Sequence, residues 1–73
     1  MAFNYSKLLG RIVEICGTQV KFAEAMNLSE RTVSLKLNNK IGWKQSEMEQ
    51  ACNILGIPYG DIPAYFFTPK SQY

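Results

Sequence analysis

Residues 19–40 read QVKFAEAMNLSERTVSLKLNNK, and this stretch decides the fold. It predicts two short helices, at about Gln19–Met26 and Ser29–Asn38, and the second is expected to stop where Asn39 takes a left-handed backbone. Between them stands Asn27, which adopts the left-handed backbone of a tight turn more readily than most residues other than glycine. Ser29 is suited to cap the second helix, because its hydroxyl can accept a hydrogen bond from an unpaired backbone amide. Two helices joined by so short a turn have helix-turn-helix geometry, so the sequence predicts that motif.

Helices are also predicted on both sides of this motif. Upstream, apolar residues recur at helical spacing over about Tyr5–Cys16, with Asn4 as the N-cap and Gly17 at the C-terminal end. The side expected to be buried consists of Tyr5, Leu8, Leu9, Ile12, Ile15 and Cys16. Downstream, a helix near Gln45–Leu55 carries an apolar stripe made of Met48, Ala51, Cys52 and Leu55. Gly56 is expected to end that helix.

The fold class predicted from these elements is all-α, a compact domain of four to five helices. The chain has 73 residues, about half the usual length per domain, and 47% of them are hydrophobic, which suffices for one core. We expect a single domain over residues 1–67 and a short C-terminal tail over 68–73. The segment near the C-terminus is expected to hold one short helix and ordered aromatic residues, namely Tyr59, Tyr65, Phe66 and Phe67.

The composition argues against several functional classes. The chain has no histidine, and Cys16 and Cys52 both fall on apolar helical faces, so neither a metal site nor a disulfide scaffold is expected. Paired carboxylates and a glycine-rich phosphate loop are also absent, so we expect no enzyme, no cofactor and no small-molecule substrate. No signal peptide or apolar run of about 18 residues is visible, which favours a cytoplasmic protein without a membrane segment.

The helix predicted at Ser29–Asn38 has an outer face suited to reading DNA bases. With Val33 at the centre of its buried side, the helical period places four residues opposite, namely Arg31, Ser34, Leu35 and Asn38. Arginine can pair with guanine, asparagine with adenine, and apolar carbons can contact the thymine methyl group. This face is therefore predicted to enter a major groove, although Leu35 is equally compatible with simple surface exposure.

The flanks of this helix are predicted to contact the DNA phosphates. Gln19 begins the preceding helix, where backbone amides and the helix dipole favour an anion. Lys36 lies beside the core face, so its stem is expected to pack while its ammonium reaches outward. Lys40 and Lys44 complete a basic rim around the same short helix, and a clustered excess of this kind suits a polyanionic partner.

The stretch at residues 19–40 resembles the helix-turn-helix of the lambda-repressor-like, Cro/CI-type (XRE-like) phage regulators. Gln19 opens the motif, Ala23 occupies its small-residue position, and Leu28 and Val33 fill its core positions. The continuation at residues 43–57, WKQSEMEQACNILGI, resembles the next helix of that superfamily. The resemblance extends over about residues 8–57. It implies a four- or five-helix domain that binds operator DNA, commonly as a dimer, and regulates transcription.

The resemblance also implies roles for single residues. Gln19 and Lys40 match phosphate-binding positions, whereas the positions that face bases or the groove wall correspond to Glu30, Arg31, Thr32 and Leu35. Glu30 could instead complement the positive end of its helix.

Two departures from the family pattern bear on the geometry. Lys36 stands where an aliphatic residue is usual, and Leu37 is expected to take over that core role, which leaves the helix rotation open by one residue. Lys44 replaces the usual hydroxyl cap before the next helix, so Ser46 is an alternative cap there.

The function predicted from the sequence is sequence-specific binding of a double-stranded DNA operator by a Cro/repressor-like transcriptional regulator of phage or prophage type, and the sequence does not distinguish a repressor from an activator. We expect a homodimer, because a single small module covers only about 600–1,000 Å² of protein surface on DNA. The aromatic residues near the C-terminus either supply the dimer surface or cover the core. The alternative is a helix-turn-helix fold used for protein binding, as in an antitoxin or an anti-repressor. The operator and the regulated genes are not encoded in these patterns.

Overall fold

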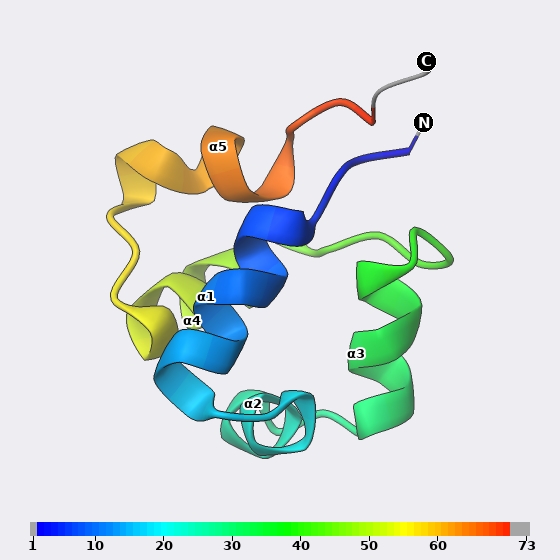
Figure 1. The fold of residues 1–73 in the computed structure, drawn as a ribbon, viewed down its shortest axis with the longest axis vertical. Helices are drawn as coiled ribbons and strands as arrows, with labels where there is room; N and C mark the ends of the chain where they lie inside the picture. Colours follow the sequence, from blue (N-terminus) through cyan, green and yellow to red (C-terminus); the bar gives the residue numbers. More distant parts are fainter. Residues whose placement is uncertain (1, 71–73) are drawn as a thin grey trace.

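The computed structural model describes residues 2–70, and within this range the chain forms five α-helices and one 3-10 turn (Figure 1). They are α1 (Ser6–Cys16), α2 (Gln19–Met26), α3 (Glu30–Leu37), α4 (Gln45–Leu55), η1 (Tyr59–Asp61) and α5 (Ile62–Phe66). The described range holds no strand, only an isolated antiparallel bridge between Phe3 and Pro69. The predicted all-α fold is thus confirmed. Of the predicted tail, positions 71–73 lie outside the described residues.

Local signals set the bounds of α2 and of the start of α3. The Thr18 hydroxyl accepts a hydrogen bond from the Lys21 amide at 3.1 Å, and the Ser29 hydroxyl accepts one from the Thr32 amide at 3.1 Å. Asn27 has the predicted left-handed backbone, with φ of 59°. Each cap satisfies one of the amides that the first turn of a helix leaves unpaired. Helix, turn and helix therefore lie where the sequence predicts them.

The core lies where the helices meet. Its largest fully buried side chains are Leu8, Ile12, Phe22, Val33, Cys52, Leu55 and Phe66. The predicted buried side of α1 was too wide, because Leu9 and Ile15 are 41% and 47% exposed. These two residues lie on opposite flanks of the Leu8–Ile12 stripe, where a helix covered on one side leaves its flanks in water.

The predicted N-cap of α1 is wrong, whereas α4 begins at the predicted Gln45. The helix α1 begins at Ser6 with Tyr5 as its N-cap, and the Asn4 side chain accepts a hydrogen bond from the Ser6 amide at 2.8 Å. The helix α4 begins at Gln45, so Ser46 is not its cap. Instead, the Glu47 carboxylate reaches back and accepts from the Lys44 amide at 2.8 Å. A carboxylate in the first turn thus replaces the missing hydroxyl.

Aromatic side chains close one end of the molecule. Phe66 is buried, and its ring packs edge-on against Trp43 with 5.2 Å between centroids. The segments before α1 and after α5 run side by side, as Figure 1 shows, and the Asn4 amide donates to the Thr68 carbonyl at 2.8 Å. Because Phe66 is buried, its side chain covers the core and is not part of an exposed dimer surface. None of the described helices is long and apolar enough to span a bilayer.

Candidate functional site

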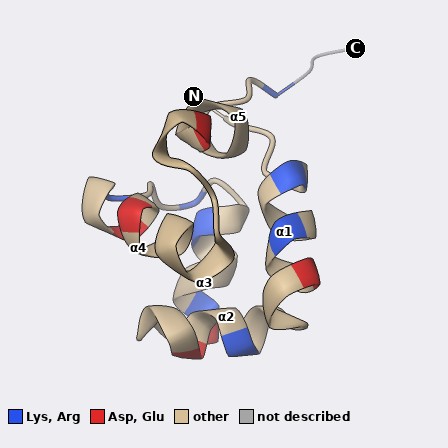
Figure 2. Ribbon diagram, turned by 90° about the vertical axis from the view of Figure 1, so that its left-hand side faces the viewer, with Lys and Arg blue, Asp and Glu red and all other residues tan. Residues whose placement is uncertain are grey.

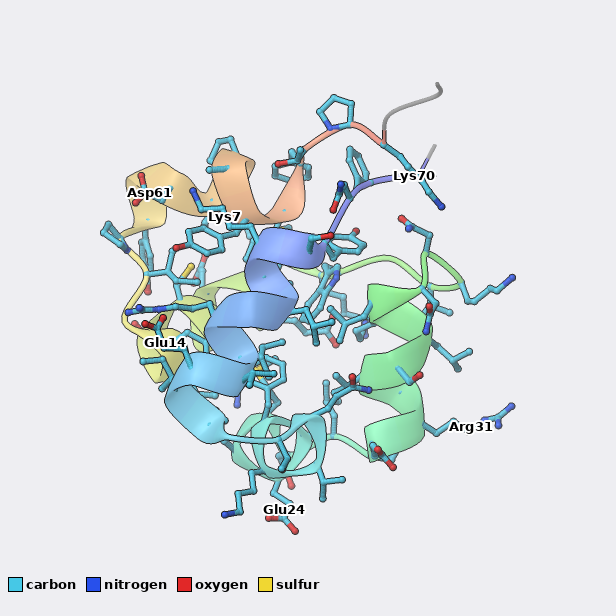
Figure 3. The ribbon with its side chains drawn as sticks, in the orientation of Figure 1. Lys7, Glu14, Glu24, Arg31, Asp61 and Lys70 are labelled. Carbon is cyan, nitrogen blue, oxygen red and sulfur yellow. The ribbon has the colours of Figure 1, made fainter. Side chains whose placement is uncertain are left out.

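The helix α3 presents an accessible face on one side of the molecule. Val33 anchors the helix, since its side chain is fully buried. Glu30, Arg31 and Asn38 are exposed, and the Arg31 side chain points away from the body of the protein (Figure 3). The remaining predicted base-facing residues are partly exposed, namely Thr32, Ser34 and Leu35. The structure thus brings all six onto one accessible helix.

These side chains differ in how far they are already engaged within the chain. The side-chain amide of Asn38 donates to the Ser34 carbonyl at 2.8 Å. The Thr32 hydroxyl accepts from the Ser29 hydroxyl at 2.9 Å. Arg31 forms no ion pair with any residue that the structure describes. Its five donors are therefore available to a partner that offers acceptors, such as a base edge, a phosphate or a carboxylate.

Three of the four predicted phosphate contacts are accessible. Gln19 is partly exposed at the first residue of α2, whose amide end favours an anion. Lys40 and Lys44 are exposed in the segment that joins α3 to α4. Together with Arg31, these two lysines give three exposed cations on α3 and on the segment that follows it. Elsewhere charges of both signs are spread over the helices rather than gathered by sign (Figure 2).

The prediction that Lys36 contacts phosphate is wrong. Its side chain is only 4% exposed, and its ammonium donates to the Gly42 carbonyl at 2.9 Å and to the Glu47 carboxylate at 2.7 Å. The position follows Val33 by three residues, so both lie on the side of α3 that faces the protein. An ammonium can remain there because a carboxylate and a carbonyl compensate for its lost hydration. Leu37 is partly buried and packs against the core as predicted, but the more deeply buried position is that of Lys36 itself.

Glu47 is the first of two residues whose structural role the sequence analysis did not predict. Burial by itself would raise the pKa of Glu47, but hydrogen bonds from the Lys36 ammonium and the Lys44 amide, with both lysine charges, outweigh it and hold the pKa below its ordinary value. The signal was present, because Glu47 stands three residues after the N-cap, where a carboxylate commonly pairs with the cap amide. That it also receives Lys36 depends on packing between α3 and α4.

A second missed residue holds the C-terminal end of α3. The chain reverses at Asn39, which has the predicted left-handed backbone with φ of 62°. Its side chain accepts from the Phe3 amide and donates to the Phe3 carbonyl, both at 2.9 Å. This reciprocal pair joins residues 36 apart in sequence, so no local pattern could have indicated it.

Other chemistry finds little support in the described range. No group of three or more histidine, cysteine, aspartate or glutamate side chains within residues 2–70 could hold a metal ion. Burial, together with the charge of Glu49, raises the pKa of the Cys52 thiol. A raised pKa lowers the thiolate fraction at neutral pH, so Cys52 is poorly suited to act as a nucleophile.

Comparison with known proteins identifies a family and a similar solved structure. A family model described as "Protein of unknown function (DUF739)" matches residues 1–69. The structure is similar to the solution structure of the modulator of repression (MOR) of the temperate bacteriophage TP901-1 from Lactococcus lactis, with a TM-score of 0.82. The two sequences are 56% identical over 99% of this chain and 97% of that one. No curated protein matches the chain.

Proposed function

The chain belongs to the DUF739 family, and from this premise we propose that it is a phage-type regulator that reads operator DNA with the outer face of α3. The observation that carries the proposal is the accessible face around Arg31, on a helix fixed by Val33 and capped by Ser29. A helix held in this way can enter a major groove without rearrangement of the fold. The 56% identity to a modulator of repression from a temperate phage supports a regulatory role.

In this proposal the residues on α3 divide into two groups. Arg31 and Asn38 recognise base edges, and Leu35 contacts a thymine methyl group. The groove wall is contacted by Glu30, Thr32 and Ser34. Gln19, Lys40 and Lys44 hold the sugar-phosphate backbone, and Lys36 is no longer among them. These are the contacts expected of a Cro/CI-type regulator, and they involve no catalysis, so we propose that the chain is not an enzyme.

We further propose that two copies bind one operator. Pairing across a twofold axis lets two recognition helices read half-sites about 34 Å apart. Because Phe66 is buried, the C-terminal aromatic residues that remain available for pairing are Tyr59, 54% exposed, and Phe67, 46% exposed. If Lys40 and Lys44 each contact one phosphate, a dimer neutralises four. The logarithm of affinity should then fall against the logarithm of salt concentration with a slope of about −3 to −4.

The test is binding to a duplex that the wild-type chain selects from a random library. Arg31→Ala should weaken binding to the selected duplex by about 5- to 160-fold for each half-site and relax the base preference, since one bidentate base contact is worth about 1–3 kcal/mol. Lys40→Ala, the matched control, should weaken selected and random duplexes alike and make the salt slope shallower by about 1 for each phosphate that is no longer neutralised. Equal losses on both duplexes for Arg31→Ala would contradict the base-reading role.

A second candidate function is favoured by one observation about the similar structure. That protein is called a modulator of repression, and a modulator can act on a repressor protein rather than on an operator. The free carboxylate acceptors of a protein partner would suit Arg31 as well as a guanine does. In this case the wild-type chain would select no duplex, and Arg31→Ala would weaken capture of the purified repressor from the same phage genome.

A further inference from the structure

We infer that Lys36 is a positioning residue, whose ammonium holds residues 38–44 in place from inside the fold and thereby sets the position of Lys40 and Lys44. The inference rests on the proposed function in one respect, namely that Lys40 and Lys44 contact DNA phosphates. The anchoring of the segment is a property of the fold and can be measured without any partner.

The geometry of the Lys36 ammonium joins three parts of the chain. It donates to the Gly42 carbonyl at 2.9 Å and to the Glu47 carboxylate at 2.7 Å, and it lies 5.7 Å from the centre of the Trp43 ring. The same Glu47 oxygen accepts from the Lys44 amide at 2.8 Å. One ion pair thus connects α3, the middle of the joining segment and the start of α4.

The joining segment is also held at Asn39, which pairs with Phe3, and at Trp43, whose ring packs against Phe66. The part that depends on Lys36 lies between these two residues. Its first half is held by the Lys40 and Ile41 amides, which donate to the Leu35 carbonyl at 2.8 and 3.4 Å. Its second half contains Gly42, whose conformational freedom makes it costly to order, and Ile41 is 42% exposed. Among the described residues, the Gly42 carbonyl has Lys36 as its side-chain donor. Removing the ammonium should therefore free this half first.

The chemistry of the position explains why a lysine serves where an aliphatic residue would only fill space. An ammonium has three donors, of which Gly42 and Glu47 take two, while the face of Trp43 attracts the same positive charge. A buried ion pair contributes little net stability compared with an apolar replacement, because desolvating both charges offsets their attraction. The directed bonds of Lys36 are therefore better explained by the geometry they impose than by stability.

The experiment compares a double variant with a matched control. Lys36→Met alone would leave the Glu47 carboxylate uncompensated, so the test variant is Lys36→Met combined with Glu47→Gln. Glutamine can still accept from the Lys44 amide, and methionine can still fill the space of the lysine stem. The control is Lys40→Met, which removes an exposed lysine from the same segment.

The readouts are backbone amide hydrogen exchange and the emission of Trp43, the single tryptophan of the chain. In the double variant we expect exchange at the Ile41 and Lys44 amides, which donate to the Leu35 carbonyl and to the residue 47 side chain, to accelerate at least about tenfold, with a shift in tryptophan emission. Core amides such as that of Leu55 should keep their protection. Lys40→Met should change none of these. Wild-type exchange at Ile41 and Lys44 in a folded double variant would overturn the inference.

A second variant decides the matter if the double variant does not fold. Glu47→Gln alone keeps the hydrogen bond from Lys36 to Gly42 but removes the negative charge that pairs with Lys36 on α4. The same amides should therefore exchange faster, by a smaller factor. No acceleration there would overturn the inference.

Binding then separates this inference from the proposed function. On the duplex selected by the wild-type chain, the double variant should lose at least as much affinity as Lys40→Met, although Lys36 touches no phosphate. Faster exchange with unchanged duplex binding would overturn the claim that Lys36 positions Lys40 and Lys44. Faster exchange in a chain whose wild type selects no duplex would support the anchoring and defeat the DNA-binding proposal alone.

Discussion

The two ends of α3 are fixed in different ways. At its start, the Ser29 hydroxyl accepts from the Thr32 amide at 3.1 Å, and all partners lie within four residues. At its end, Asn39 pairs with Phe3 across 36 residues, and Lys36 pairs with Glu47 on the next helix. The start is therefore encoded locally, whereas the end depends on the assembled fold. A change at the end should disturb distant segments, and a change at the start should not.

The largest effect is expected at the C-terminal end. Asn39→Ala should lower the free energy of unfolding by about 2 kcal/mol, because alanine resists the left-handed backbone and both hydrogen bonds to Phe3 are lost. Urea unfolding measures the loss, and amide exchange at Phe3 shows whether it reaches the N-terminal segment.

Asn39→Gly is the matched control for this variant. Glycine accepts the left-handed backbone but cannot bond to Phe3, so the loss should shrink to about 1 kcal/mol. Equal losses for alanine and glycine would show that backbone conformation contributes nothing at this position.

An intermediate effect is expected at the start of α3. Ser29→Ala should cost about 1 kcal/mol, because the Thr32 amide loses its acceptor. The loss should appear in urea unfolding, and faster amide exchange should be confined to the first turn of α3. Thr18→Ala, which removes the equivalent cap of α2, should cost a similar amount. Faster exchange at Phe3 in Ser29→Ala would break the distinction between the two ends.

The smallest effect is a dependence on pH that belongs to the C-terminal end. The pKa of Glu47 is lowered in the folded chain, so its contribution to stability is fully present above its unfolded-state pKa, at about 4.3. That contribution is lost as the pH falls from there through the lower folded-state pKa. Wild type and Glu47→Gln should therefore differ in unfolding free energy at pH 6 and converge towards pH 3. A constant difference over this range would contradict the assignment.

The sequence predicts the backbone of this protein well because its signals are local. The bounds of α2 and α4 follow from the apolar stripes and the residues that end each helix, and Asn27 and Asn39 adopt the predicted left-handed backbone. Each of these features depends on residues within one or two turns. The six residues predicted to face DNA also lie on an accessible helix, although their contacts stay predictions.

The errors concern side chains whose surroundings come from distant segments. The sequence around Lys36 is that of a surface lysine, and its burial depends on Glu47, which α4 places beside it. Leu9 and Ile15 match the helical period of the core, yet the neighbouring helices are too few to cover the flanks of α1. No sequence pattern indicates the contacts of Phe3, because its partners, Asn39 and the segment around Pro69, lie far away in the sequence. The helical period of the apolar residues predicts which side of a helix is apolar, but it does not predict how much of that side the neighbouring helices bury.

The pairing of the segments around Phe3 and Pro69 has a practical consequence for anyone who labels this protein. A fluorophore attached near Phe3 or near Pro69 would lie at the same place, beside Asn39 and the segment after α3. Such an attachment risks masking the very residues whose contacts are to be measured. A probe on the exposed face of α1, for example at Val13, would leave that neighbourhood untouched.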